Sequence, residues 1–220
     1  MAIDHSQGWE AVADRFMKIR SEVGTAVVRS WAQEYLLPSS SIVDVGCGSG
    51  VPIAKALTDD GFALFGIDAS PTLIAAFRDN LPAKPVVCEP AQDSAFFGRT
   101  FEGAVSIGLI FLLSANNQRR VLGKVAGALD PGGRFLFSAP RQACEWSDTL
   151  TGRASLSLGA DAYATHLDRL GLSVLIPSVR DADSRGGFPK RRNYESMSSG
   201  WRALSWVQRL DCETTLMQRA

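Results

Sequence analysis

The sequence predicts an α/β protein with a Rossmann-like, doubly wound, mostly parallel sheet and helices on both faces. Two observations predict this fold. A β-branched run at Ile42–Val45 ends in glycines at alternate positions, and an apolar helical pattern follows at once. This order indicates a strand, a tight turn and a helix. A second apolar run at Ala63–Ile67 ends in Asp68, so that strand, helix and strand succeed one another as in a β-α-β unit.

The remaining elements follow from the spacing of apolar residues and turn formers. We expect one helical stretch over residues 8–35, further helices over residues 52–60, 72–80, 116–129 and 158–170, and strands over residues 85–89, 103–107, 134–139 and 172–178. Asp130–Gly133 is typical of a turn. The long stretch 140–159 mixes aromatic and charged residues, which favours an ordered lid.

The pattern changes after Arg180. Residues 181–200 are polar and lack alternation, as in a flexible segment, and residues 201–217 indicate a short amphipathic helix. We therefore predict a main domain at residues 1–180 and a divergent, partly flexible C-terminal tail at residues 181–220. Whether a last antiparallel strand completes the sheet stays open.

Composition and charge exclude several classes of protein. The 220 residues, 45% of them hydrophobic, suffice for one well-filled domain. Lys plus Arg equals Asp plus Glu at 23 each, so no overall positive field favours nucleic acid. The apolar runs are shorter than the roughly 20 residues of a membrane span, and the four cysteines have neither zinc-site nor redox-pair spacing. We expect a soluble cytoplasmic protein without a metal, a nucleic-acid partner or a membrane partner, and of undetermined oligomeric state.

The glycine turn at Gly46–Gly50 is the candidate ligand site. Glycine permits positive φ and a close approach of the ligand to the backbone. The third glycine of a dinucleotide fingerprint would fall at Val51, and no phosphate-loop lysine follows. Asp68 comes 22 residues after Gly46, the spacing that brings a carboxylate to the lip of the adjacent strand, where it can accept both ribose hydroxyls. A nucleoside without phosphates fits these facts.

Three motifs extend this pattern along the chain: Val43–Gly50, Gly66–Ser70 and Leu129–Phe135. In this order they resemble the motif set of the class I S-adenosylmethionine-dependent methyltransferases, over roughly residues 8–180. The resemblance implies S-adenosylmethionine as the cofactor and direct displacement of its sulfonium methyl by an acceptor. Such a reaction needs mainly alignment and water exclusion from the protein. We expect a small-molecule acceptor, whose identity the sequence does not reveal.

The resemblance also assigns residues to the cofactor. Asp68 holds the ribose, Asp44 supports the glycine turn and the cofactor's amino end, and Arg20 contacts its carboxylate. In the loop of residues 90–96, which holds the adenine, Asp93 is the first choice and Gln92 the second. The expected cofactor-binding residues are Asp44, Gly46, Cys47, Gly48, Gly50, Asp68, Ala69, Ser70, Gln92, Asp93, Ile107 and Arg20.

The acceptor side is less well defined by sequence. Ser106–Leu113 lacks the Asn/Asp-Pro-Pro-Tyr motif of enzymes that methylate adenine, cytosine or glutamine amino groups, and Phe111 stands where many small-molecule relatives carry histidine. No general base is assigned, and the catalytic residues are unknown. Trp9 and Phe16 either close the site or simply form the buried face of their helix. The expected substrate-side residues are Trp9, Phe16, Phe111, Arg141 and Trp146.

Two other functions remain open at the level of sequence. A non-catalytic S-adenosylmethionine-binding module, acting as a regulator or partner subunit, would share the same motifs. A nucleoside- or NAD-binding oxidoreductase would share the fold, but Val51 at the third glycine position counts against it.

Overall fold

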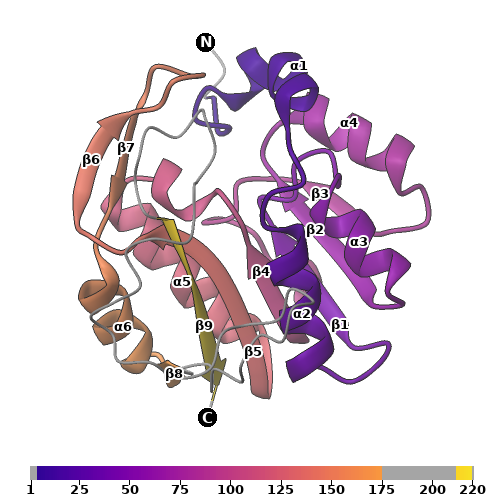
Figure 1. Ribbon diagram of the computed structural model, residues 1–220, viewed down its shortest axis with the longest axis vertical. Helices are drawn as coiled ribbons and strands as arrows, with labels where there is room; N and C mark the ends of the chain where they lie inside the picture. Colours follow the sequence, from indigo (N-terminus) through magenta and orange to yellow (C-terminus); the bar gives the residue numbers. More distant parts are fainter. Residues whose placement is uncertain (1–3, 175–211, 220) are drawn as a thin grey trace, which may run out of the picture.

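A computed structural model of the chain describes residues 4–174 and 212–219 (Figure 1). Its centre is a seven-stranded sheet in the order β3-β2-β1-β4-β5-β9-β8. The strands are β1 (Ser41–Val45), β2 (Ala63–Asp68), β3 (Val86–Cys88), β4 (Phe101–Ser106), β5 (Leu129–Pro140), β8 (Leu172–Val174) and β9 (Cys212–Arg219). β1 to β5 are parallel, and β9 runs antiparallel to both β5 and β8. The predicted Rossmann-like, mostly parallel sheet is confirmed.

The last antiparallel strand, which the sequence left open, is present. β9 lies between β5 and β8, with Gln218 opposite Arg134 and Cys212 opposite Pro140. The helix predicted over residues 201–217 is therefore wrong where it overlaps β9. Pairing with β9 satisfies the backbone groups along an edge of β5 that would otherwise be open. Residues 175–211 lie outside the described part of the chain, so the domain boundary at residue 180 stays a prediction.

Helices cover both faces of the sheet, as predicted (Figure 1). They are α1 (Trp9–Ile19), α2 (Thr25–Tyr35), α3 (Ile53–Asp59), α4 (Pro71–Asn80), α5 (Ala115–Ala128) and α6 (Ala160–Asp168). Successive strand residues point to opposite faces. In β1, Ile42 belongs to a buried cluster with Trp31 of α2 and Phe77 of α4, whereas Val43 belongs to a second cluster with Leu122 of α5.

The single helical stretch predicted over residues 8–35 is wrong, because the structure has two helices there. α1 ends at Ile19, and Arg20 takes an extended conformation with φ −61° and ψ 124°. Gly24 precedes α2 with φ +89°, a conformation that favours glycine. The apolar periodicity continues across the break, which is why the pattern did not reveal it.

The predicted turn at Asp130–Gly133 is an irregularity inside β5. Leu129 pairs with Phe101 and Arg134 with Gly103, so that β5 carries extra residues between two points of pairing. Such a bulge keeps the strand in the sheet while it bends the chain locally. The turn-forming residues were identified correctly, but the strand begins before them.

The predicted lid at residues 140–159 is ordered and contains a β-hairpin. β6 (Cys144–Ser147) pairs antiparallel with β7 (Ala154–Ser157), with Trp146 opposite Ser155. In Figure 1 this hairpin rises beside the N-terminal end of the chain, at the same end of the sheet as α1. Within the described ranges no helix has both the length and the apolar character that crossing a bilayer requires.

Candidate functional site

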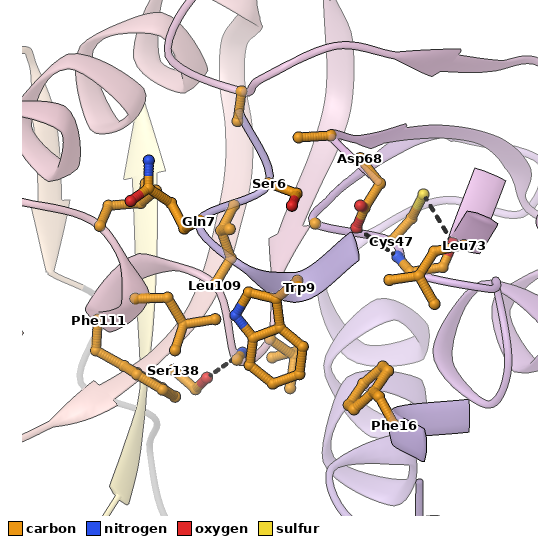
Figure 2. A pocket seen from close by; sticks show the side chains of 18 of the residues that line it. Ser6, Gln7, Trp9, Phe16, Cys47, Asp68, Leu73, Leu109, Phe111 and Ser138 are labelled. Atoms are coloured by element: carbon orange, nitrogen blue, oxygen red, sulfur yellow. Dashed lines mark hydrogen bonds between the residues drawn. The ribbon is translucent and has the colours of Figure 1, made fainter. Parts of the chain in front are cut away.

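A cavity of about 450 Å³ lies at the carboxyl ends of β1, β2 and β4, among the glycine turn, the N-terminal segment and the β6–β7 hairpin (Figure 2). The strand order reverses at β1, which has β2 on one side and β4 on the other. Open α/β sheets bind ligands at such a switch point. The predicted site residues that line the cavity are Trp9, Phe16, Arg20, Asp44, Gly46, Cys47, Gly48, Asp68, Ala69, Gln92, Ile107, Phe111 and Trp146.

Four predicted site residues, Gly50, Ser70, Asp93 and Arg141, do not line the cavity. Gly50 has φ +79°, and a Cβ there would come within 2.8 Å of the Phe77 ring. Ser70 is fully buried, and its hydroxyl accepts a hydrogen bond from the Leu73 N–H at the start of α4. Both residues shape the frame of the site rather than its surface.

The loop of residues 90–96 presents Gln92 to the cavity instead of Asp93. Gln92 is buried and lines the cavity. Asp93 forms an ion pair with Arg120 at 2.8 Å, with both side chains well exposed. The geometry therefore makes Gln92, the second choice from the sequence, the candidate for adenine contact.

Asp68 lies beside the glycine turn. Gly46 and Gly48 have φ values of +82° and +55°, and the Gly48 N–H donates to Asp68 Oδ2 at 2.9 Å. The Ser70 N–H donates to Asp68 Oδ1, also at 2.9 Å. Burial raises the pKa of Asp68, although these backbone donors oppose the shift. The carboxylate thus points toward the mouth of the turn, as contact with a ribose requires.

Asp44 and Arg20 bring opposite charges to the inner end of the cavity. Asp44 is 3% exposed at the end of β1. Burial, together with the like charge of Asp68, raises the pKa of Asp44 to about 7, while Arg20 opposes the shift. Burial also lowers the pKa of Arg20. The raised pKa shows that Arg20 does not fully compensate the buried carboxylate, so a ligand ammonium would be favourable there.

Cys47 fills a small space behind the turn. Its Sγ lies 2.8 Å from the position that a Cβ on Gly66 would occupy. Burial raises the pKa of the Cys47 thiol well above its ordinary value. A thiol that stays protonated is a poor nucleophile, so Cys47 serves packing.

The far side of the cavity is lined by aromatic rings. Phe111, in the 3₁₀ helix η2 (Ile110–Leu112), and Trp146 of β6 have ring centroids 5.5 Å apart. Figure 2 shows Phe111 across the cavity from Asp68. The cavity therefore has a polar half at the glycine turn and an aromatic half at the hairpin.

The N-terminal segment is attached to two parts of the fold around the cavity. Asp4 forms an ion pair with Arg153 of the β6–β7 hairpin at 2.9 Å. Glu10 of α1 accepts a hydrogen bond from Thr72 Oγ1 of α4 at 2.7 Å. Trp9 lies between these attachments in the sequence and lines the cavity (Figure 2).

Sequence reasoning missed several residues of the lining, among them Ser6, Gln7, Leu109, Ser138 and Asp148. Asp148 had a usable signal, because it lies in the long segment that was expected to act as a lid. Gln7 had none, since nothing in the local pattern shows that the N-terminal segment reaches the hairpin. Ser138 Oγ accepts a hydrogen bond from the Gly108 N–H at 2.8 Å. No sequence pattern indicates this contact between the ends of neighbouring strands.

Together, the switch point at β1, the glycine turn and the adjacent carboxylate define a Rossmann-like protein with a nucleoside-type site. Residues 43–137 match the family model described as a methyltransferase domain. This match covers less than half of the chain, and it supports the resemblance to the class I S-adenosylmethionine-dependent methyltransferases that the three motifs predicted.

Relatives are similar over part of the chain or in fold. The ribosomal protein L11 methyltransferase of Symbiobacterium thermophilum is 31% identical over 114 residues, which are 52% of this chain and 36% of that protein. The chain thus covers little more than a third of the length of this curated relative. The CcbJ methyltransferase of Streptomyces caelestis has a TM-score of 0.69 at 14% identity, covering 99% of this chain and 100% of its own. A TehB-like SAM-dependent methyltransferase of Corynebacterium glutamicum has a TM-score of 0.64 at 16% identity, covering 98% of each chain. At these identities the structural likeness establishes the fold.

Proposed function

We propose that this chain transfers a methyl group from S-adenosylmethionine to a small-molecule acceptor. The observation that carries the proposal is the two-sided cavity, in which the glycine turn and Asp68 face an aromatic wall. Bound S-adenosylmethionine supplies a methyl group that an acceptor nucleophile can take directly from the sulfonium sulfur.

The residues present fit the cofactor. Asp68 is placed to accept the ribose hydroxyls, and Gln92 to hydrogen-bond the adenine edge. Asp44 suits the ammonium of the amino-acid portion, because its raised pKa reflects a buried carboxylate in need of a positive partner. Arg20, which lines the same cavity, suits the carboxylate of that portion.

The chain's own contribution to the reaction is orientation and the exclusion of water. The N-terminal segment and the hairpin both line the cavity and are joined by the Asp4–Arg153 ion pair. Enclosure of this kind holds two reactants together and strengthens polar interactions inside the site. Phe111 is buried and apolar, so η2 shapes the acceptor pocket and supplies no base.

A protein acceptor is the second candidate, because the curated relative acts on ribosomal protein L11 by its name. The N-terminal segment and the hairpin both line the cavity and are joined by the Asp4–Arg153 ion pair, and this enclosure favours a small acceptor. A protein side chain would need this connection to open.

Two measurements test the proposal. Titration calorimetry with S-adenosylhomocysteine should show binding, and failure to bind would refute the proposed function. Tritium-labelled S-adenosylmethionine should then transfer label to a member of a metabolite panel. Transfer to purified ribosomal protein L11 alone would establish the second candidate. Binding without transfer to either class would favour a non-catalytic cofactor-binding module.

A further inference from the structure

We infer that Asp148 recognises a cationic amine on the acceptor, a proposal that rests on the proposed function and names its substrate class. Asp148 follows β6 directly and lines the cavity together with Trp146. The residue is 7% exposed, and none of the cofactor contacts described above uses it. A carboxylate with so little exposure needs a compensating partner.

One oxygen of Asp148 is fully engaged in the hairpin loop. Asp148 Oδ1 accepts hydrogen bonds from the Leu150 N–H at 3.0 Å, the Thr151 N–H at 2.7 Å and Thr151 Oγ1 at 2.8 Å. The Asp148 N–H donates to the Arg153 carbonyl at 2.8 Å. The carboxylate is therefore held in one orientation by its own loop.

The second oxygen is left for a ligand. Asp148 Oδ2 accepts no hydrogen bond from any residue that the structure describes. A carboxylate has acceptor sites on both oxygens. An asparagine would close the same loop through its carbonyl oxygen without carrying a charge. The hydrogen bonds within the loop thus account for an acceptor oxygen at the Oδ1 position, but they do not account for a negatively charged side chain beside the cavity.

The surroundings favour a positively charged partner. The other charged side chains along the described lining are Arg20, Asp44 and Asp68, all grouped at the cofactor half. Asp148 is the charged residue of the described lining on the aromatic half, to which Trp146 and Phe111 contribute their paired rings. Carboxylates and aromatic faces both attract ammonium groups.

The acceptor class that fits is an amine joined to a flat apolar body, such as an arylalkylamine. The apolar body would lie against the aromatic wall, while the ammonium would donate to Oδ2. An ammonium held in this way has no lone pair, so the methyl group goes to another atom of the acceptor or to this nitrogen only after it has lost a proton.

Two probes of nearly equal shape test this inference on protein saturated with S-adenosylhomocysteine. Tryptamine carries an ammonium where tryptophol carries a hydroxyl, and calorimetry compares their affinities. The wild type should bind tryptamine at least tenfold more tightly than tryptophol. No binding of tryptamine, or equal binding of the two probes, would overturn the inference without any variant.

Variants then locate the effect. Asp148→Asn keeps the loop acceptor and should abolish the preference for tryptamine. Glu145→Gln removes one charge from an exposed position of the same hairpin, outside the lining, and should keep the preference. An undiminished preference in Asp148→Asn would overturn the inference. Affinity for S-adenosylhomocysteine should be equal in all three proteins. A loss of this affinity would show that the cofactor site has failed, which is a different result from a loss of the preference for tryptamine.

Discussion

The pKa of about 7 at Asp44 makes cofactor affinity depend on pH in a calculable way. An ammonium is bound by the ionised carboxylate and not by the neutral acid. With that pKa, about nine-tenths of Asp44 is ionised at pH 8 and about one-thirtieth at pH 5.5. The affinity for S-adenosylhomocysteine should therefore fall on the order of 30-fold between these two pH values.

Calorimetric titration at several pH values, corrected for buffer ionisation, measures this dependence. In Asp44→Asn the affinity should be low throughout and the steep fall below pH 7 should disappear. A wild-type affinity that is flat from pH 8 to pH 5.5 would refute the reasoning. An Asp44→Asn variant whose affinity still falls as steeply with pH as that of the wild type would also refute it, because another group would then cause the pH dependence.

The same pKa predicts a change in stability of the ligand-free protein, with a definite sign. The folded pKa of Asp44 lies above its ordinary value of 3.8, so the folded state holds the proton more tightly. This contribution to the free energy of unfolding is fully present below pH 3.8 and is lost as pH rises through about 7. It amounts to at most about 4 kcal/mol. Urea denaturation at several pH values gives the free energy of unfolding. The dependence of this free energy on pH over the interval should differ between the wild type and Asp44→Asn.

Four further substitutions test the site and the packing of the fold. Asp68→Ala should weaken S-adenosylhomocysteine binding about 100-fold or more, since two charge-assisted hydrogen bonds to a ribose are lost; an unchanged affinity by calorimetry would remove Asp68 from the site. Gly50→Ala should lower the free energy of unfolding by about 2 kcal/mol or more, because φ is +79° and the new Cβ meets a phenylalanine ring at 2.8 Å. Gly123→Ala, in α5 with open space around it, should instead raise it by about 0.5–1 kcal/mol, and urea denaturation compares the two. Tyr163→Phe should cost about 1–2 kcal/mol in the same assay, because the buried Gln118 loses the hydroxyl that donates to its amide oxygen at 2.6 Å; an unchanged midpoint would contradict this.

The sequence alone was sufficient for the β-α-β unit and its ligand turn. The alternate glycines after β1 and the acid at the end of β2 lie within one local unit, whose geometry follows from strand, turn and helix lengths. Gly46, Gly48 and Asp68 therefore line the cavity as expected. The motifs also predicted the resemblance to a methyltransferase domain, which the family model supports over residues 43–137, because they reflect this same local geometry.

The tertiary structure alone decided which distant segments meet. Which residue of the loop after β3 faces the cavity, Gln92 or Asp93, depends on how the loop packs against α5 and not on its composition. Residues 212–219 have no clear alternation, and they form a strand because β5 and β8 present backbone groups to pair with; strand preference depends on neighbours in this way.

What the sequence determined is therefore the glycine turn and Asp68, which belong to one β-α-β unit. What only the folded chain determined is the choice of Gln92 in the loop after β3 and the closure of the acceptor half, where the N-terminal segment meets a hairpin nearly 150 residues away through Asp4 and Arg153. Local backbone geometry repeats from protein to protein and leaves a readable pattern. A contact between distant segments depends on the packing of everything between them, so no local pattern in the sequence indicates it.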